Sequence, residues 1–134
     1  MEKFTVKTRR RTEFVEITSE VAQILAEGGI KDGSVIVFIP HTTAGITINE
    51  NADPDVQRDM IFEMNKVIPF EDGYHHFEGN SAAHIKASLF GSSVTLIVSD
   101  GSMCLGRWQG IYLCEFDGPR TREVWVKISP DIKP

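Results

Sequence analysis

The segment GSVIVFIP, residues 33–40, constrains the fold more than any other part of the chain. It is a short, nearly continuous apolar run rich in β-branched residues, which predicts a buried central strand, and Pro40 ends its hydrogen-bonding ladder. Residues 46–50, ITINE, alternate apolar and polar side chains and predict a half-buried strand. Because a short polar stretch separates the two runs, we expect them to pair as antiparallel strands.

Further periodic segments flank this pair on both sides. Alternation over residues 3–9 and 13–17 predicts two strands, and three more follow at 93–99, 103–116 and 122–129. Helical spacing predicts helices over residues 18–27, 54–68 and 81–90, the first ended by Gly28 and Gly29. The order ββαββααβββ predicts an α+β fold with a mainly antiparallel sheet or small sandwich.

The size and charge of the chain limit the classes of protein to which it can belong. A chain of 134 residues with 41% hydrophobic and 25% charged residues is typical of one globular domain, here residues 1–134. The net charge of −5 argues against an extended nucleic-acid surface, and no apolar run is long enough for a membrane helix. We therefore expect a cytoplasmic protein with no nucleic-acid or membrane partner, whose Cys104 and Cys114 are buried, reduced thiols.

All four histidines lie in the middle third of the chain, together with several carboxylates and amides. Histidine and carboxylate groups at strand and loop ends can bind a divalent metal or act as general acids and bases. His75 and His76 are neighbours and point to opposite sides of an extended chain, so we expect one of them to face the site, and His76 would share its side with Glu78 and Asn80. Asp53, before Pro54, is most simply a helix N-cap.

The segment GRWQG, residues 106–110, interrupts an apolar alternation. Trp108 in this segment suits the wall of a site for a ring-shaped ligand, or an interface. Arg120 and Arg122 suit a carboxylate or phosphate ligand, and the alternative is an ion pair with Glu115 or Asp117. The sequence contains no P-loop, GxGxxG, GxSxG or HExxH motif, which argues against P-loop nucleotide hydrolysis and serine hydrolysis.

Residues 40–60, 74–91 and 105–128 together resemble the YjbQ-like family, whose members have been described as secondary thiamine-phosphate synthases. The resemblance implies an α+β sandwich of about seven strands with two to three helices, assembled as a homotrimer. It also implies an enzyme that couples hydroxymethylpyrimidine diphosphate to hydroxyethylthiazole phosphate with release of pyrophosphate. Its ligand would be a phosphorylated small molecule, and a divalent metal, Mg or Zn, would assist without an organic cofactor.

The residues and the resemblance together assign provisional roles. Three histidines, His41, His76 and His84, are candidate metal ligands. The candidate catalytic residues are these three with Glu50 and Asp53, and the candidate substrate-binding residues are Asn51, Asn80, Arg107, Trp108, Gln109 and Arg120. Two alternatives remain open at this point: a trimeric metal- or ligand-binding protein, and a metal-assisted phosphohydrolase.

Overall fold

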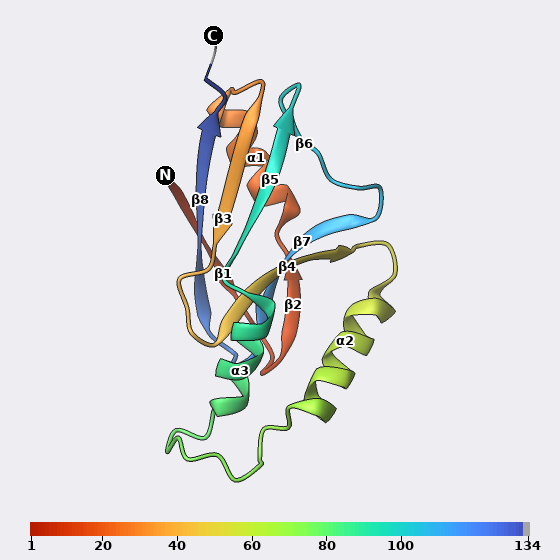
Figure 1. Ribbon diagram of the computed structural model, residues 1–134, viewed down its shortest axis with the longest axis vertical. Coiled ribbons are helices and arrows are strands. Elements are labelled where there is room, and N and C mark those ends of the chain that lie inside the picture. The colour runs from red at the N-terminus through yellow and green to blue at the C-terminus, as the bar shows by residue number, and fades with distance from the viewer. Residues whose placement is uncertain (133–134) are drawn as a thin grey trace.

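A computed structural model describes residues 1–132 of the chain and confirms the α+β class (Figure 1). It has eight strands and three helices, because a turn at residues 104–108 interrupts the strand predicted over 103–116. The elements are β1 (Glu2–Lys7), β2 (Glu13–Glu16), α1 (Thr18–Gly28), β3 (Gly33–Phe38), β4 (Ala44–Glu50), α2 (Pro54–Val67), α3 (Ser81–Phe90), β5 (Ser93–Ser99), β6 (Ser102–Met103), β7 (Gln109–Glu115) and β8 (Thr121–Pro130).

The strands form two antiparallel sheets, one of five strands in the order β1-β8-β3-β5-β6 and one of three in the order β2-β7-β4. The expected pairing of residues 33–40 with residues 46–50 is wrong. β3 pairs with β5 and β8, whereas β4 pairs with β7, so the connection at residues 39–43 crosses from one sheet to the other. Pro40 cannot donate to a ladder, which favours a crossing at this point.

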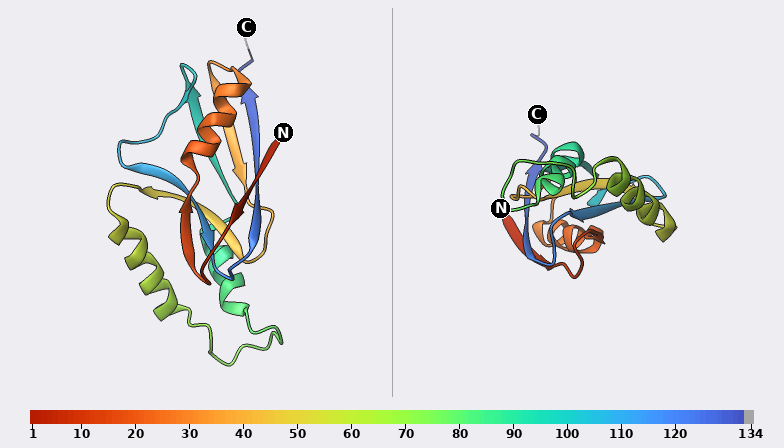
Figure 2. Two further views of the ribbon diagram at one scale, coloured as in Figure 1. Left: turned by 180° about the vertical axis from the view of Figure 1, so that it is seen from behind. Right: turned by 90° about the horizontal axis from the view of Figure 1, so that it is seen from below.

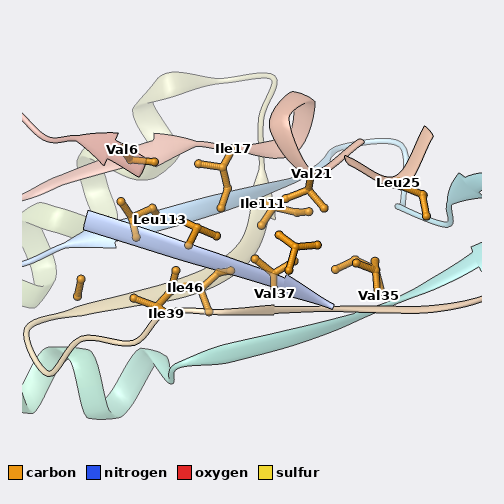
Figure 3. Packing of buried hydrophobic residues seen from close by; sticks show 14 of the residues in the cluster. Val6, Ile17, Val21, Leu25, Val35, Val37, Ile39, Ile46, Ile111 and Leu113 are labelled. Carbon is orange, nitrogen blue, oxygen red and sulfur yellow. The ribbon is translucent and has the colours of Figure 1, made fainter. Parts of the chain in front are cut away.

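The main core lies between the sheets and α1 (Figure 3). Val35 and Val37 of β3 are fully buried and face α1 and β7, where Val21 and Ile111 are also fully buried. The opposite face of β3 differs from the expectation, since Phe38 is 36% exposed. The apolar run is therefore a central strand with one face in the core and the other open in the single chain.

Helix α2 lies along one side of the molecule and packs closely on neither sheet, although Gln57 Nε2 donates to the carbonyl oxygen of Glu50 in β4 (Figures 1 and 2). Asp53 is its N-cap as predicted, because its Oδ1 accepts a hydrogen bond from the backbone N–H of Asp55 at 2.9 Å. The helical spacing of α2 predicts a buried apolar stripe of Val56, Met60, Ile61, Met64, Val67 and Ile68. This prediction is wrong, since none of the residues of α2 is buried in the described chain and Val67 is 64% exposed. The helix is amphipathic, but no other part of the single chain covers its apolar side chains fully.

Helix α3 packs closely on β4, and this contact positions part of the site. A Cβ added to Gly45 would come within 2.8 Å of the carbonyl oxygen of Gly91, so the strand approaches the end of the helix as only glycine allows. Ala83 and Ala87 of α3 are buried in the smaller core cluster. The packing brings α3 beside the β3–β4 connection.

Two further expectations concern membranes and cysteines. Within residues 1–132, no helix has the length and apolar character needed to cross a bilayer. Both cysteines are free thiols, and Cys114 is buried as expected. The prediction that Cys104 is buried is wrong, because it lies exposed in the turn that follows β6.

Candidate functional site

A hollow of about 750 Å³ is lined by the β3–β4 connection, the segment before α3 and the β7–β8 connection. These three segments lie in the lower half of the molecule in Figure 1. Five of the predicted site residues line the hollow, although they lie far apart in the sequence. They are His41, His76, Asn80, His84 and Arg120.

His41 follows the end of β3 and is tied to the start of β8. Its Nε2 accepts a hydrogen bond from the backbone N–H of Glu123 at 2.9 Å, so the neutral ring carries its proton on Nδ1. Burial lowers the pKa of His41, the nearby Arg122 lowers it further, and Glu123 and Glu115 oppose the shift. The ring is thus held neutral, with one nitrogen occupied by the backbone.

His76 and His84 meet on another wall of the hollow. Their rings lie edge to face with centroids 5.6 Å apart, and His76 Nε2 lies 3.9 Å from Glu78 Oε1. The hydroxyl of Ser88 donates to the carbonyl oxygen of His84, so this serine binds the backbone and not the imidazole. His76, Glu78 and Asn80 all line the hollow. The extended chain expected there does not form, because residues 77–78 are a turn in which the backbone N–H of Gly79 donates to the carbonyl oxygen of His76 at 3.1 Å.

Arg120, Asp117 and Asn80 form a chain of contacts along one side. Arg120 donates from its Nη2 to Asp117 Oδ2 at 3.1 Å, and Asn80 Nδ2 donates to the same oxygen at 2.9 Å. Because a carboxylate only accepts, it fixes which end of the Asn80 amide faces Asp117. Asn80 Oδ1 is then buried and has no hydrogen-bond partner among the described residues. An unpaired buried acceptor costs about 1–3 kcal/mol, which marks this side chain as unusual.

Arg122 lines the floor of the hollow, where it is paired with Glu115. The Nε of Arg122 donates to Glu115 Oε1 at 2.8 Å, its Nη2 donates to the other oxygen, and both side chains are almost wholly buried. Thr8 and the backbone N–H of Asp117 also donate to Glu115. The ion pair that the sequence offered as the alternative role for Arg122 is the one that forms.

The other predicted site residues lie at the opposite end of β4. Asn51 pairs with the backbone there, its N–H donating to the carbonyl oxygen of Trp108 at 2.8 Å. The guanidinium of Arg107 stands over the Trp108 ring at 4.9 Å. A seven-residue strand spans roughly 23 Å, so this end is remote from His41. The expectation that one site holds all these residues is wrong for the single chain; those outside the hollow are Glu50, Asn51, Asp53, Arg107, Trp108 and Gln109.

The predicted three-histidine metal site does not form from these positions. Within residues 1–132, no group of three or more histidine, cysteine, aspartate or glutamate side chains converges closely enough to hold a metal ion. His41 is also poorly placed as a ligand, since its Nε2 lone pair accepts from Glu123 and its Nδ1 carries the proton. The histidines share a hollow without sharing a coordination point.

Sequence reasoning missed the part played by Asp117. It considered this carboxylate only as an ion-pair partner for arginine, whereas the side chain also orients Asn80, 37 residues earlier in the chain. The EFDGPR segment signals an ion pair but says nothing about a partner so distant in sequence. Thr43, whose carbonyl and hydroxyl oxygens accept from Arg122, was overlooked for the same reason.

Comparisons with known proteins agree with one another. A family profile described as "UPF0047 protein YjbQ-like" matches residues 2–131. UPF0047 protein MJ1081 of Methanocaldococcus jannaschii is 52% identical over 129 residues, covering 96% of this chain and 94% of that protein, and UPF0047 protein YugU of Bacillus subtilis is 53% identical over 124 residues, covering 92% and 94%.

Solved structures show the same fold. A YjbQ/UPF0047 protein from Clostridium acetobutylicum matches with a TM-score of 0.95 and 54% identity, covering 96% of this chain and all of that one. A YbjQ-like protein of unknown function from Sulfolobus solfataricus matches with a TM-score of 0.93 and 32% identity, covering 97% and 96%.

These comparisons correct the expected activity. The relatives carry only family names, and the Sulfolobus protein is described as being of unknown function, so nothing in them indicates thiamine-phosphate synthase activity. They favour neither of the two alternatives, a trimeric metal- or ligand-binding protein and a metal-assisted phosphohydrolase.

Proposed function

The chain belongs to the UPF0047 YjbQ-like family, and we propose that its histidine-lined hollow is an enzyme active site for a phosphorylated small molecule. The observation that carries this proposal is the convergence of three histidines and Arg120 from distant segments on one hollow. The unpaired Asn80 Oδ1 in its wall also supports it, because a ligand group that donates a hydrogen bond would relieve the cost of that acceptor.

Two features favour a phosphate group. The side chain of Arg120 is half-exposed at the hollow. Its Nε and Nη2 donate to the carbonyl oxygen and Oδ2 of Asp117, which leaves the other donors of the guanidinium for a ligand oxygen. Helix α3 starts beside it with no side-chain cap among the described residues, so the positive end of the helix dipole adds to the attraction. Arg122 contributes less, since Glu115 neutralises its charge.

Acid–base chemistry is the reaction type that the histidines favour. Imidazoles transfer protons efficiently near neutral pH, and two of them, His76 and His84, lie edge to face in the same wall. His41, held neutral by its surroundings, offers an Nδ1–H donor instead. A metal ion is not needed for this assignment.

A homotrimer in the cytoplasm completes the proposal. An assembly would cover apolar surface that the single chain exposes, on α2 at Phe62 and Val67 and on the open face of β3 and β5 at Phe38 and Ile97. The two free thiols are compatible with a reducing compartment. Sedimentation equilibrium should give three times the chain mass of 15.0 kDa, and a monomer would refute the assembly.

The test of ligand binding uses a matched pair of arginine variants. We expect calorimetry to detect glycerol phosphate binding to the wild type, and Arg120→Gln to weaken it at least tenfold. Arg107→Gln removes the same charge at the far end of β4 and should leave the affinity unchanged. Failure of the wild type to bind any simple phosphate ester would refute the proposal.

The test of catalysis follows phosphorus resonances. Incubation of the wild type with pooled phosphorylated small molecules should produce new ³¹P signals, and His84→Gln should reduce their rate of appearance at least a hundredfold. Equal rates in the two proteins would show that the reaction does not depend on His84 and would contradict the proposed active site.

A further inference from the structure

A second hollow, of about 450 Å³, adjoins the first on the side of α3 and β4. The two hollows share four lining residues, and they are His41, Thr42, His84 and Ser92. Two of the three histidines therefore stand at the boundary between two connected spaces, and not at the end of a single one.

The two hollows differ in their chemistry. The first is lined by charged side chains, among them Glu78, Asp117 and Arg120. Apart from the shared residues, the second is lined by Ala44, Ala87, Ser88 and Gly91, which are all uncharged. The Ser88 hydroxyl already donates to the carbonyl oxygen of His84, so this wall presents mainly methyl and backbone groups.

The backbone conformation at Gly91 keeps this wall of the second hollow free of a side chain. Gly91 has a φ of +93°, which side chains rarely adopt, and a Cβ added there would meet nothing within 4 Å. The close approach of Gly45 to Gly91 holds β4 and α3 in this arrangement. The open space is thus a consequence of how the helix meets the strand, and it does not depend on the choice of a flexible side chain.

We propose that the second hollow is a subsite for the uncharged part of the ligand. The substrate would then be a phosphate ester of two parts, with its phosphate in the first hollow and a compact uncharged group beside Ala87 and Gly91. The bond between the two parts would lie against His41 and His84. This inference rests on the proposed function and adds a substrate class to it.

The test compares inorganic phosphate with propyl phosphate by calorimetry. The wild type should bind propyl phosphate at least tenfold more tightly, because burial of three carbon atoms adds to the phosphate contacts. Ser88→Leu, which fills the second hollow from an exposed helix position, should remove most of this difference. Ser19→Leu adds the same side chain at an exposed position of helix α1, outside both hollows and away from the open face of β3 and β5, and should behave as the wild type.

The outcomes separate the two proposals. Absence of binding of both probes to the wild type would overturn the proposed function and this inference with it. Equal affinity for the two probes in the wild type would overturn only the subsite, as would a Ser88→Leu protein that folds and still prefers propyl phosphate. Thermal unfolding of each variant establishes that it folds.

Discussion

Arg122 and Glu115 form an ion pair beneath the hollow with 4% and 0% of their respective surfaces exposed. Thr8, Thr43 and the backbone of Asp117 complete their hydrogen bonds. The pair joins the end of β7 to the start of β8, so the connection that carries Arg120 is anchored at both ends. A buried pair of this kind is expensive to break from one side, because the remaining charge is left without compensation.

Replacing Glu115 by leucine should therefore lower the free energy of unfolding by about 3–5 kcal/mol. Urea denaturation at neutral pH measures the loss. Arg58→Ala provides the control, since it breaks an ion pair with Asp55 whose two side chains are 78% and 64% exposed, and it should cost less than about 1 kcal/mol. Similar losses in the two variants would contradict the structural importance of the buried pair.

The lowered pKa of His41 predicts a loss of stability on mild acidification. Between the folded-state pKa and the ordinary value of 6.5, the unfolded chain binds more protons at this position than the folded chain. The free energy of unfolding should accordingly rise with pH through this window and level off above about pH 6.5. His41→Gln keeps a neutral acceptor for the Glu123 N–H and should show a smaller fall below that pH. Parallel pH profiles for the two proteins would argue against the lowered pKa.

Lys86 provides a second titration, at alkaline pH. Its ammonium group is buried against the Phe70 ring at 4.1 Å and donates to Asn65 Oδ1 at 2.6 Å. Burial, with a smaller effect of Arg11, lowers its pKa to about 8 from the ordinary 10.5. The unfolded chain binds more protons between these values, so the stability of the wild type relative to Lys86→Met should rise from pH 8 to 10.5. A difference independent of pH would contradict this assignment.

Asp53, predicted as a catalytic residue, is expected to act only as a helix cap in the single chain. Asp53→Ala should destabilise the first turn of α2 by about 1 kcal/mol, whereas Asp53→Asn retains a capping oxygen and should preserve it. Because α2 buries little surface, the effect should appear as faster amide exchange at residues 55–57 rather than as global unfolding. Asp59→Ala, in the middle of the helix, is the control. Equal exchange in the alanine and asparagine variants would show that the cap is unimportant.

The secondary structure was largely predictable because it depends on local pattern. Asp53 before Pro54 placed the start of α2, and the glycine pair at Gly28 and Gly29 placed the end of α1, where Gly29 adopts a left-handed φ of 67°. The pairing of β3 with β4 was not predictable from their short connection. A turn of this length can join two strands of one sheet or carry the chain to another, and distant partners in β5, β7 and β8 decide between the two.

The site was predictable only in part, because residues that are close in sequence were expected to be close in space. Glu50 and Asn51 lie within ten residues of His41, but those residues include β4, whose extended backbone carries them to the other end of the sheet. His76, Glu78 and Asn80 do lie on one side, but a turn at residues 77–78 places them there and not the alternation of an extended chain. The contact of Asn80 with Asp117 joins separate segments and has no local signature.

Within residues 1–132, β1 is the first strand, and it pairs with β8, the last. On the ribosome, β1 emerges long before β8 has been synthesised, so it cannot complete its sheet pairing until β8 has emerged as well. The same late segment brings Arg122 into the floor of the hollow. A chain terminated before β8 would thus lack both the sheet partner of β1 and part of the candidate site, so ligand binding would report that translation had passed through β8.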